Sequence, residues 1–403
     1  MPNADDKTCP TNATSGRGTA PAPRCYRNLD FYARRLLRQN RLPGRLRLAM
    51  LGGTDKLLAA RRIDKHLRFS PADGVELDVW LIRGRGPAAA LLEKWHGRPA
   101  HESHGRPARV ECPCLQGRDG YKSYRTYRTY RVNAPPLQGR DGPDTHGQDA
   151  RATPAAAPGN AAAPTAPDNA PGTVLIIHGL WDSKGRLFRL GELLARRGFD
   201  VVLPDLRRHG DSTGGFTTFG ALEKRDMLAL MTSLRAAGDV RGPLWVFGFS
   251  MGAATAVQYS ALDPLVRGAV AVAPFADGRS ITKRLAPLMS RRKFDAVWSR
   301  AAEIAGFDPD DTSTIEAARR LHCPLIVIHG RLDLIVPYSH GRAVFEAAPQ
   351  PKRLYTIGWA GHPSLLLKGR RWFADRIAEV IALAGAVGAT NTGKKGSEEA
   401  EEG

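Results

Sequence analysis

The sequence predicts an α/β fold: a mostly parallel central sheet with helices on both faces, an antiparallel hairpin before it and a small helical cap. Three observations support this prediction. From residue 173 onward, short continuous apolar runs alternate with stretches of helical pattern. Earlier, an Asp-Gly pair separates two segments of alternating apolar residues, which is a strong hairpin signal. Later, residues 276–323 read as helices between two strands, as a cap would.

The N-terminal part, residues 1–65, is expected to be a basic extension that is partly helical. It holds 14 lysine and arginine residues against 5 acidic residues. Residues 1–26 are polar and rich in proline, glycine and threonine, which is typical of disorder. Residues 29–63 place leucines among arginines and predict one or two helices broken near Pro43. Because their apolar face is interrupted, we favour helices packed on the domain over helices lying on a membrane.

The formal net charge of the chain is +19. Such charge favours contact with nucleic acid or with an anionic membrane. Beyond residue 65, however, the basic residues are interspersed with acidic ones, as on an ordinary solvated surface. We therefore expect no nucleic-acid partner, and we leave open a weak membrane contact through residues 29–63 as well as the oligomeric state.

Residues 66–385 are expected to form the main domain, interrupted by an insertion. A hairpin is predicted at residues 66–83, with its turn at Ala72-Asp-Gly74. Residues 85–171 then repeat short units without a fixed period; His96-Gly-Arg-Pro-Ala100, for example, returns at residues 104–108. Too few apolar residues are present to bury a core, so we expect a low-complexity insertion in a loop between two strands. A long loop of this kind costs little closure entropy.

The cysteines and histidines indicate neither a disulfide framework nor a metal centre. The cysteine count is odd and the spacing is scattered, which favours a reducing compartment. The five are Cys9, Cys25, Cys112, Cys114 and Cys323. The Cys-Pro-Cys unit lacks the two-residue gap of common zinc sites, although His96, His101 and His104 lie near it in the sequence. The chain shows no apolar run of about 18 residues and no apolar start, so we expect a cytoplasmic protein.

Strands and helices alternate through the rest of the domain, which predicts a parallel sheet covered on both faces. The expected strands are 173–178, 200–205, 244–250, 268–273, 325–329 and 353–357. The expected helices are 186–197, 221–237 and 251–261, with 281–289, 294–304 and 315–320 in the cap. The hairpin is expected to pair at one edge of the sheet, and residues 386–403 are expected to be a disordered tail.

Two segments match the pattern Gly-x-Ser-x-Gly: residues 248–252 around Ser250, and residues 210–214 around Ser212. A nucleophile elbow requires a strand, a sharp turn and a helix in immediate succession, with small residues where the helix approaches the sheet. Ser250 meets this requirement, because a strand precedes it and an alanine-rich helix follows. Ser212 is followed by more loop. We therefore identify Ser250 as the candidate nucleophile.

A serine hydroxyl requires a base, and the base requires an acid that orients it. Late in the chain, His329 ends an apolar strand and His340 lies in a helical stretch. His362 instead follows the last strand, in a loop at the carboxyl edge of the sheet, where sites of open α/β sheets gather. Asp333 lies in the equivalent loop after the preceding strand. We predict His362 as the base and Asp333 as its partner.

Stabilisation of an oxyanion requires two backbone N–H donors. Met251 supplies one at the start of the helix, and Leu180 is expected to supply the other from the loop after the first parallel strand. Residues expected to line the substrate pocket are Trp181, Leu285, Met289 and Trp298. For the three in the cap, simple packing of the cap is an equal alternative.

In their order, these segments resemble the α/β-hydrolase superfamily, and most closely its serine-aminopeptidase-like and esterase-like branch. The segments are His178-Gly179, residues 205–212, 248–252 and 329–333, and Gly361-His362. The resemblance covers about residues 66–385 outside the insertion. It implies the α/β-hydrolase fold and makes residues 205–212 a structural loop, which agrees with the choice of Ser250.

The function expected from these residues is hydrolysis of an ester, and less readily of an amide, through an acyl-enzyme and without a cofactor or metal. Two alternatives remain open. The same three residues also suit an acyltransferase, in which another acceptor replaces water. A protein of a different class, a basic membrane- or nucleic-acid-associated binding protein on a hydrolase scaffold, would explain the N-terminal charge but not the three residues.

Overall fold

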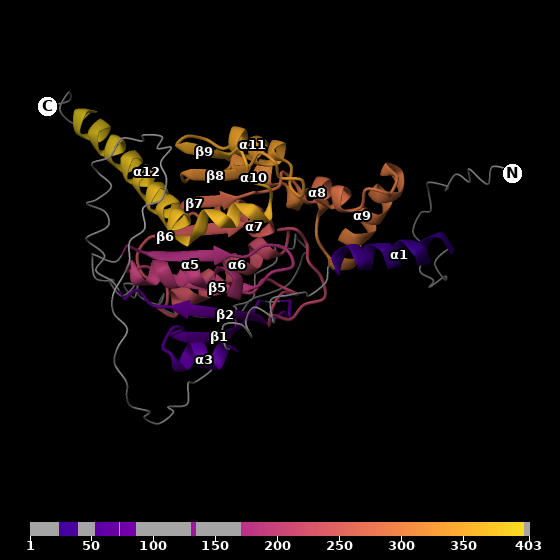
Figure 1. Ribbon diagram of the computed structural model, residues 1–403, viewed down its shortest axis with the longest axis horizontal. Helices are drawn as coiled ribbons and strands as arrows, with labels where there is room; N and C mark the ends of the chain where they lie inside the picture. Colours follow the sequence, from indigo (N-terminus) through magenta and orange to yellow (C-terminus); the bar gives the residue numbers. More distant parts are fainter. Residues whose placement is uncertain (1–23, 39–52, 72, 86–129, 134–170, 399–403) are drawn as a thin grey trace, which may run out of the picture.

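The computed structural model describes residues 24–38, 53–71, 73–85, 130–133 and 171–398. In this part of the chain the strands form one nine-stranded sheet, in the order β3-β1-β2-β5-β4-β6-β7-β8-β9 (Figure 1). The strands are β1 (Lys65–Ser70), β2 (Leu77–Ile82), β3 (Tyr130–Asn133), β4 (Thr173–Ile177), β5 (Asp200–Pro204), β6 (Leu244–Phe249), β7 (Val266–Val272), β8 (Leu325–Gly330) and β9 (Lys352–Ile357).

The sheet is mostly parallel, as predicted. Strands β5, β4, β6, β7, β8 and β9 run in one direction, each parallel to its neighbour. The predicted hairpin forms between β1 and β2, with Phe69 opposite Leu77, and β2 joins the parallel part by pairing antiparallel with β5. The carboxyl ends of the parallel strands therefore meet at one edge of the sheet, where the predicted site residues lie.

Helices cover both faces of the sheet, which the strand sequences require. On β4, Leu175 and Ile177 pack into one apolar cluster, while Val174 and Ile176 pack into the other. Successive side chains of a strand point to opposite faces, so an unbroken apolar run buries both of them. One face is covered by α6 (Glu223–Ala236), α7 (Met251–Ser260), α10 (Thr314–Arg319) and α11 (Tyr338–Ala347). The other is covered by α3 (Gly53–Ala59), α5 (Lys184–Arg196) and α12 (Gly369–Glu398).

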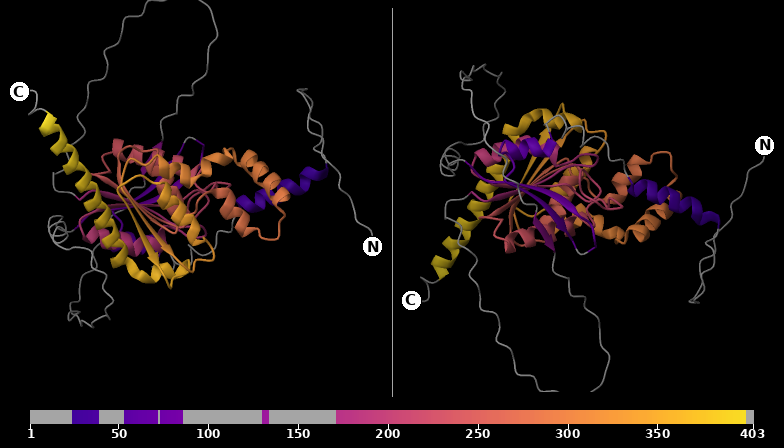
Figure 2. Two further views of the ribbon diagram at one scale, coloured as in Figure 1. Left: turned by 90° about the horizontal axis from the view of Figure 1, so that it is seen from above. Right: turned by 90° about the horizontal axis from the view of Figure 1, so that it is seen from below.

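A small cap extends beyond the carboxyl edge of the sheet (Figures 1 and 2). It consists of α8 (Gly278–Leu285) and α9 (Arg291–Ala305), followed by the 3-10 turn η1 (Pro309–Thr312). The third helix predicted for the cap is α10, which instead packs on α7 and α11 in the layer over the sheet. A short 3-10 segment, η2 (Pro363–Lys368), precedes α12.

The N-terminal helix α1 (Arg24–Leu37) packs on α9, so part of the basic extension supports the cap. Leu36 and Leu37 are buried in the apolar cluster, while Arg34 and Arg35 are exposed. An ion pair between Asp30 and Arg300, with 2.6 Å between Oδ1 and Nε, links the two helices. In the structure, α1 thus packs on the domain. The break expected near Pro43 lies outside the described residues.

Two expectations about irregular segments are wrong. The insertion was expected to be without structure and the hairpin to be the edge of the sheet, but β3, inside the insertion, pairs parallel with β1 and is the edge strand. The free backbone groups of β1 accept such a strand readily, and Tyr130 and Val132 are residue types that favour it. The rest of the insertion, including its cysteines and histidines, lies outside the described residues.

The tail expected to be disordered from residue 386 instead continues α12 as far as Glu398. Glycines in this stretch weaken a helix by about 1 kcal/mol each, but a helix that is already formed adds one hydrogen bond per residue. No proline follows Pro363 to interrupt that series. Among the described residues, no helix combines the length and the apolar character needed to cross a membrane.

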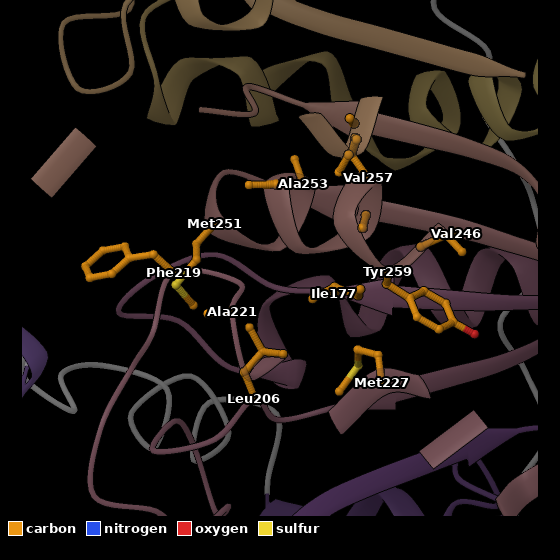
Figure 3. Packing of buried hydrophobic residues seen from close by; sticks show 14 of the residues in the cluster. Ile177, Leu206, Phe219, Ala221, Met227, Val246, Met251, Ala253, Val257 and Tyr259 are labelled. Carbon is orange, nitrogen blue, oxygen red and sulfur yellow. The ribbon is translucent and has the colours of Figure 1, made fainter. Parts of the chain in front are cut away.

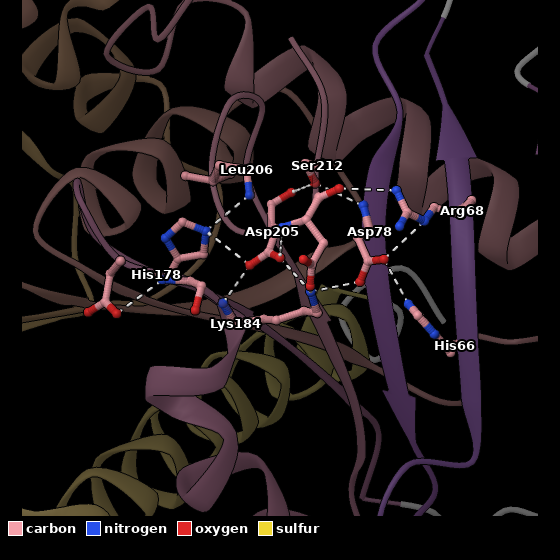
Figure 4. A network of polar contacts seen from close by, with 11 residues as sticks. His66, Arg68, Asp78, His178, Lys184, Asp205, Leu206 and Ser212 are labelled. Carbon is pink, nitrogen blue, oxygen red and sulfur yellow. Dashed lines mark hydrogen bonds and ion pairs between the residues drawn. The ribbon is translucent and has the colours of Figure 1, made fainter. Parts of the chain in front are cut away.

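A buried cation joins the hairpin to the parallel sheet. The ammonium of Lys184, which is 2% exposed, lies 2.7 Å from Asp78 Oδ1 and 3.2 Å from Asp211 Oδ2, and it also contacts Asp205 (Figure 4). Burial alone would lower the pKa of Lys184, but the neighbouring Asp205 and Asp78 carboxylates raise it well above its ordinary value. The Lys184 ammonium also lies over the ring of Trp80, 4.8 Å from the ring centroid. One side chain of α5 thus neutralises carboxylates on β2 and after β5.

We predict that Lys184→Met lowers the free energy of unfolding by about 3–5 kcal/mol, because it removes the buried cation that Asp78 and Asp205 share, and Asp78 keeps only its pairing with Arg68 and His66 at the other carboxylate oxygen. Urea denaturation monitored by circular dichroism measures this loss. Arg189→Met on the same helix is the matched control: Arg189 is exposed and pairs at 3.0 Å with Glu192, so we expect less than about 1 kcal/mol. Equal midpoints for wild type and Lys184→Met would contradict the prediction.

Candidate active site

Ser250 lies in a strained turn between a strand and a helix. Strand β6 ends at Phe249 and helix α7 begins at Met251, so one residue makes the whole turn. Its φ of 55° and ψ of −119° lie in a region that a residue with a side chain rarely adopts, at a cost of about 1–3 kcal/mol. The Ser250 N–H donates to the carbonyl of Val272 at 2.8 Å, which ties the turn to the neighbouring strand β7.

Two glycines let α7 approach the sheet closely enough to make this turn. A Cβ placed on Gly248 would lie 2.2 Å from the carbonyl oxygen of Gly252, and a Cβ on Gly252 would lie 2.3 Å from the carbonyl oxygen of Ile177. Neither distance is possible between real atoms. The close packing continues along the helix, where Tyr259 lies among Ile177, Val246 and Met227 (Figure 3). The sharp turn between strand and helix that the sequence predicts is present. Its two glycines lie where the backbone of α7 meets the backbones of β6 and β4.

The three residues predicted to act together form one chain of hydrogen bonds. His362 Nδ1 lies 2.6 Å from Asp333 Oδ2, and His362 Nε2 lies 2.9 Å from Ser250 Oγ. A carboxylate only accepts, so Nδ1 carries the ring proton and Nε2 accepts from the serine hydroxyl. His362 is 8% exposed and Asp333 is 4% exposed. The ring of His362 also packs at 5.3 Å from that of Phe249.

Asp333 is held in place by its own loop. Its Oδ1 accepts from the backbone N–H groups of Ile335 at 3.0 Å and Val336 at 2.8 Å, which leaves Oδ2 for His362. The loop therefore fixes the orientation of the carboxylate that faces the imidazole.

The serine and the two histidines that were not chosen as nucleophile or base lie elsewhere. Ser212 is buried; its Oγ donates to the carbonyl of Asp205 and accepts from the N–H of Asp78, both at 2.8 Å, so it holds the structural loop to β2. His329 is fully buried, and its Nε2–H donates to the carbonyl of Val336 at 2.9 Å. Burial lowers the pKa of His329, which suits a neutral ring in the core. His340 lies on α11 and is described below.

Leu180 and Met251, whose backbone N–H groups are predicted to bind an oxyanion, both line the cavity onto which the serine opens. His178 orients the first of them: its Nδ1–H donates to the carbonyl of Gly179 at 2.8 Å, while its Nε2 accepts from the N–H of Leu206 at 3.0 Å. Burial lowers the pKa of His178 to about 4, so the ring is neutral at neutral pH. In a trans peptide the C=O and N–H point in opposite directions, so the Leu180 N–H turns away from this ring.

The cavity at Ser250 has a volume of about 200 Å³ and a mostly apolar lining. Of the predicted pocket residues, Trp181 and Leu285 line it. The predictions of Met289 and Trp298 are wrong: Met289 packs against the core, and Trp298, 2% exposed, stacks on Phe294 within the cap. An aromatic side chain on an amphipathic helix can either line a pocket or pack within the cap. Trp298 packs within the cap because it lies on the apolar face that α9 shares with α1.

Several lining residues were missed from the sequence. They follow the carboxyl ends of strands or lie in the cap: Phe219, Phe249, Phe275, Ile281, Ile335 and Val336. Phe275 follows β7 at the carboxyl edge of the sheet. The argument that located Asp333 and His362, that site residues gather at this edge, therefore also applies to Phe275. Phe219 lies in the loop after β5, at the positive φ of 54°, and nothing in its local sequence indicates the cavity.

One acidic cluster has the spacing of a cation site. Oxygens of Asp78, Asp205 and Asp211 lie within 4.8 Å of one another. The ammonium of Lys184 contacts all three carboxylates, so the protein supplies the cation itself. Within the described residues this cluster serves the fold, and it lies apart from the residues that line the cavity.

Comparisons with known proteins agree with the fold. The family described as serine aminopeptidase, S33, matches residues 168–304, a segment that contains Ser250 and ends before Asp333 and His362. The chain is 27% identical over 227 residues to the uncharacterized protein YqkD of Bacillus subtilis (strain 168), covering 54% of this chain and 73% of that protein. It is 28% identical over 193 residues to the uncharacterized protein YfhR of Escherichia coli (strain K12), covering 47% of this chain and 62% of that protein.

Two further proteins carry descriptive names. The chain is 27% identical over 190 residues to the lysophosphatidylserine lipase ABHD12 of Danio rerio, covering 45% of this chain and 48% of the lipase. Among solved structures, the esterase Pf2001 of Pyrococcus furiosus is 17% identical with a TM-score of 0.49, covering 80% of this chain and 94% of the esterase. The chain thus spans about half of the lipase and most of the esterase.

We predict that Gly252→Ala lowers the free energy of unfolding by at least about 1–3 kcal/mol, because its Cβ must displace the end of β4, including the carbonyls of Ile177 and His178. Gly185→Ala on α5 is the control: its Cβ would lie 3.6 Å from Ser183 Oγ, an ordinary van der Waals contact, so the change should be neutral or stabilise by up to about 1 kcal/mol. Urea denaturation compares the two. A Gly252→Ala protein as stable as wild type would show that α7 does not need this approach.

Proposed function

This chain belongs to the α/β-hydrolase superfamily, and we propose that it is a serine hydrolase that cleaves an ester, and less readily an amide, through an acyl-enzyme on Ser250. The observation that carries the proposal is the continuous hydrogen bonding from Ser250 Oγ through His362 to Asp333, at 2.9 and 2.6 Å. Both distances lie within the range over which a base takes a proton from its nucleophile.

The proposed reaction begins when the His362 Nε2 accepts the Ser250 hydroxyl proton as the serine oxygen attacks the carbonyl carbon. The imidazolium that forms lies against the Asp333 carboxylate, whose charge stabilises it. The imidazolium then gives its proton to the leaving group, and the acyl group stays on Ser250. Water repeats the sequence: His362 takes a proton from it, the water oxygen attacks the acyl carbon, and the proton returns to Ser250.

The oxyanion that forms during each attack is assigned to the N–H groups of Met251 and Leu180. Met251 is the first residue of α7, where the helix leaves its N–H groups free and its dipole favours negative charge. Leu180 is the neighbour of the peptide carbonyl that His178 holds. Donors that are fixed before the reaction need no reorganisation when charge develops, and each is worth about 10²–10³ in rate.

The size and character of the cavity favour small acyl groups. About 200 Å³ enclosed by Phe219, Phe249 and Phe275 suits an apolar group of limited length. Each methylene that it buries contributes about 0.8 kcal/mol. We therefore expect short-chain esters to be better substrates than long-chain ones.

We predict that Ser250→Ala reduces hydrolysis of p-nitrophenyl butyrate by at least about 10³-fold, because no other group replaces the nucleophile. The same change should abolish labelling by a fluorophosphonate probe, read by in-gel fluorescence. Ser212→Ala is the matched control, since it removes a hydroxyl of the second Gly-x-Ser-x-Gly segment and lies outside the cavity. Full labelling of Ser250→Ala, or complete loss in a folded Ser212→Ala protein, would reject the assignment.

We predict that Asp333→Asn lowers kcat by about 10²–10⁴-fold with little change in stability. The side chain keeps its shape and its Oδ1 contacts with the loop, but it loses the charge that stabilises the His362 imidazolium. Asp182→Asn is the control, because Asp182 also lines the cavity but pairs with Arg186. Steady-state kinetics on the same ester compares the two variants, and similar kcat values for both would remove Asp333 from the mechanism.

A further inference from the structure

An open groove of about 670 Å³ adjoins the cavity at Ser250 on its cap side. The two share Trp181, Leu285 and Ile335 as lining residues, so a single molecule can occupy both. The outer part of the groove is lined by Lys283 and Arg284 at the end of α8 and by His340 on α11. We call this part, defined by those three residues, the cationic groove.

No acidic side chain balances these cations among the described residues that line the groove. The ammonium of Lys283 contacts the carbonyl of Ala286 at 3.4 Å and lies 5.9 Å from the centroid of the Phe294 ring. The guanidinium of Arg284 donates to the carbonyl of Leu334 from Nε at 3.0 Å and from Nη2 at 2.7 Å. An ammonium has three donors and a guanidinium has five, so both keep N–H groups for a further ligand.

Two other cations of the cap are used differently. Arg279 on α8 contacts Asp295, and Arg300 on α9 pairs with both Asp30 and Glu303. These pairs join helices to each other or stabilise one helix. Lys283 and Arg284 have no such carboxylate within ion-pair distance among the described residues, and their uncompensated charge lies where the groove meets the cavity.

His340 adds a neutral donor to the same wall. Its Nδ1 accepts from the backbone N–H of Ala276 at 3.1 Å, so the neutral ring must carry its proton on Nε2. Burial lowers the pKa of His340; Arg284 adds to the lowering, while Asp277 and Asp333 oppose it. Those two carboxylates are already engaged, Asp277 with Ser280 and Asp333 with His362.

Other lining residues of the groove are apolar and open to solvent. Leu334 is 78% exposed, Ile335 is 41% exposed and Trp181 is 39% exposed. Large apolar side chains left in water beside a binding cavity indicate a ligand that covers them. The groove therefore offers both cations and apolar surface, which matches an amphiphilic ligand.

We propose that the cationic groove binds a phosphate or carboxylate group of the same ester whose carbonyl meets Ser250, so that the substrate class is an anionic, amphiphilic ester. The inference rests on the proposed function, because it deepens the description of the same site. The acyl group enters the apolar cavity, and the anionic group receives N–H donors from Lys283, Arg284 and His340. Charge-assisted bonds of this type are about twice as strong as neutral ones.

The test compares two soluble substrates that differ only in the anionic group: 1-hexanoylglycerol and 1-hexanoylglycerol 3-phosphate. We expect wild type to have a kcat/KM at least about tenfold higher for the phosphorylated ester. Lys283→Gln combined with Arg284→Gln should raise KM for that ester about tenfold or more and leave kcat/KM for the neutral ester within about twofold. Unchanged hydrolysis of the neutral ester also shows that this double variant is folded.

Arg291→Gln combined with Arg292→Gln is the matched control. It removes the same two charges from exposed positions of the cap that do not line the groove, so both esters should behave as in wild type. An equal loss in both double variants would mean a general effect of net charge and would overturn the inference. Equal kcat/KM for the phosphorylated and the neutral ester in wild type, both in solution and in vesicles, would overturn it too.

Two further arms complete the experiment. The first repeats the comparison with 1-oleoylglycerol and 1-oleoylglycerol 3-phosphate in phosphatidylcholine vesicles, and it identifies the source of the anion. Preference for the phosphorylated ester of the hexanoyl pair indicates a soluble ester. Preference for the phosphorylated ester of the oleoyl pair alone indicates a lipid headgroup. Either result supports the groove. If neither ester is cleaved, or cleavage survives in Ser250→Ala, the proposed function fails. If Ser250-dependent cleavage of both esters is indifferent to phosphate, only this inference fails.

Discussion

The close contact of helix α7 with strands β4 and β6 is the constraint on which the site depends. Gly248 and Gly252 allow backbone atoms to meet where any Cβ would collide, and the turn between them has a single residue. That residue, Ser250, must adopt a positive φ, which directs its hydroxyl out of the sheet edge toward the loop that carries His362. The strain is sustained because the two apolar clusters hold the strands and the helix in place on either side.

Buried polar groups also hold the loop between β4 and α5 at the same edge of the sheet. The loop that carries Leu180 begins after His178 and ends at Lys184, the first residue of α5. His178 is fixed by the N–H of Leu206, and Lys184 is fixed by carboxylates on β2 and after β5. Both ends of the loop are thus tied to buried partners, which restricts the peptide between them. Polar groups that are costly to bury are retained where they hold a backbone donor in position.

Sequence reasoning succeeded where the chemistry is local. The strands of the parallel sheet have apolar runs because both of their faces are buried, and the turn at Ser250 needs small residues at fixed offsets, so both features are visible in the chain. Asp333 and His362 could be located because parallel strands bring their carboxyl ends to one edge. The hydrogen bonds that join them follow from that placement.

The errors concern features that depend on distant partners. Trp298 and Met289 are apolar residues of the cap, and the cap packs with α1 into the same apolar cluster that covers one face of the sheet. The edge strand β3 exists because β1 offers free backbone groups, which its own composition does not reveal. The expected disordered tail instead continues α12, because a helix that is already formed gains one hydrogen bond for each residue that it adds.

The distribution of charge connects the fold to recognition. Elsewhere in the described part of the chain, carboxylates attract cations: Lys184 contacts the buried Asp78 and Asp205 and the half-buried Asp211, and Arg207 binds Asp226 through two bonds of 2.6 and 2.7 Å. At the cationic groove, Lys283 and Arg284 instead meet carbonyl oxygens and the Phe294 ring. Leaving two cations together at the mouth of the cavity gains nothing in stability. Such an arrangement is explained if the missing counter-charge arrives with the ligand.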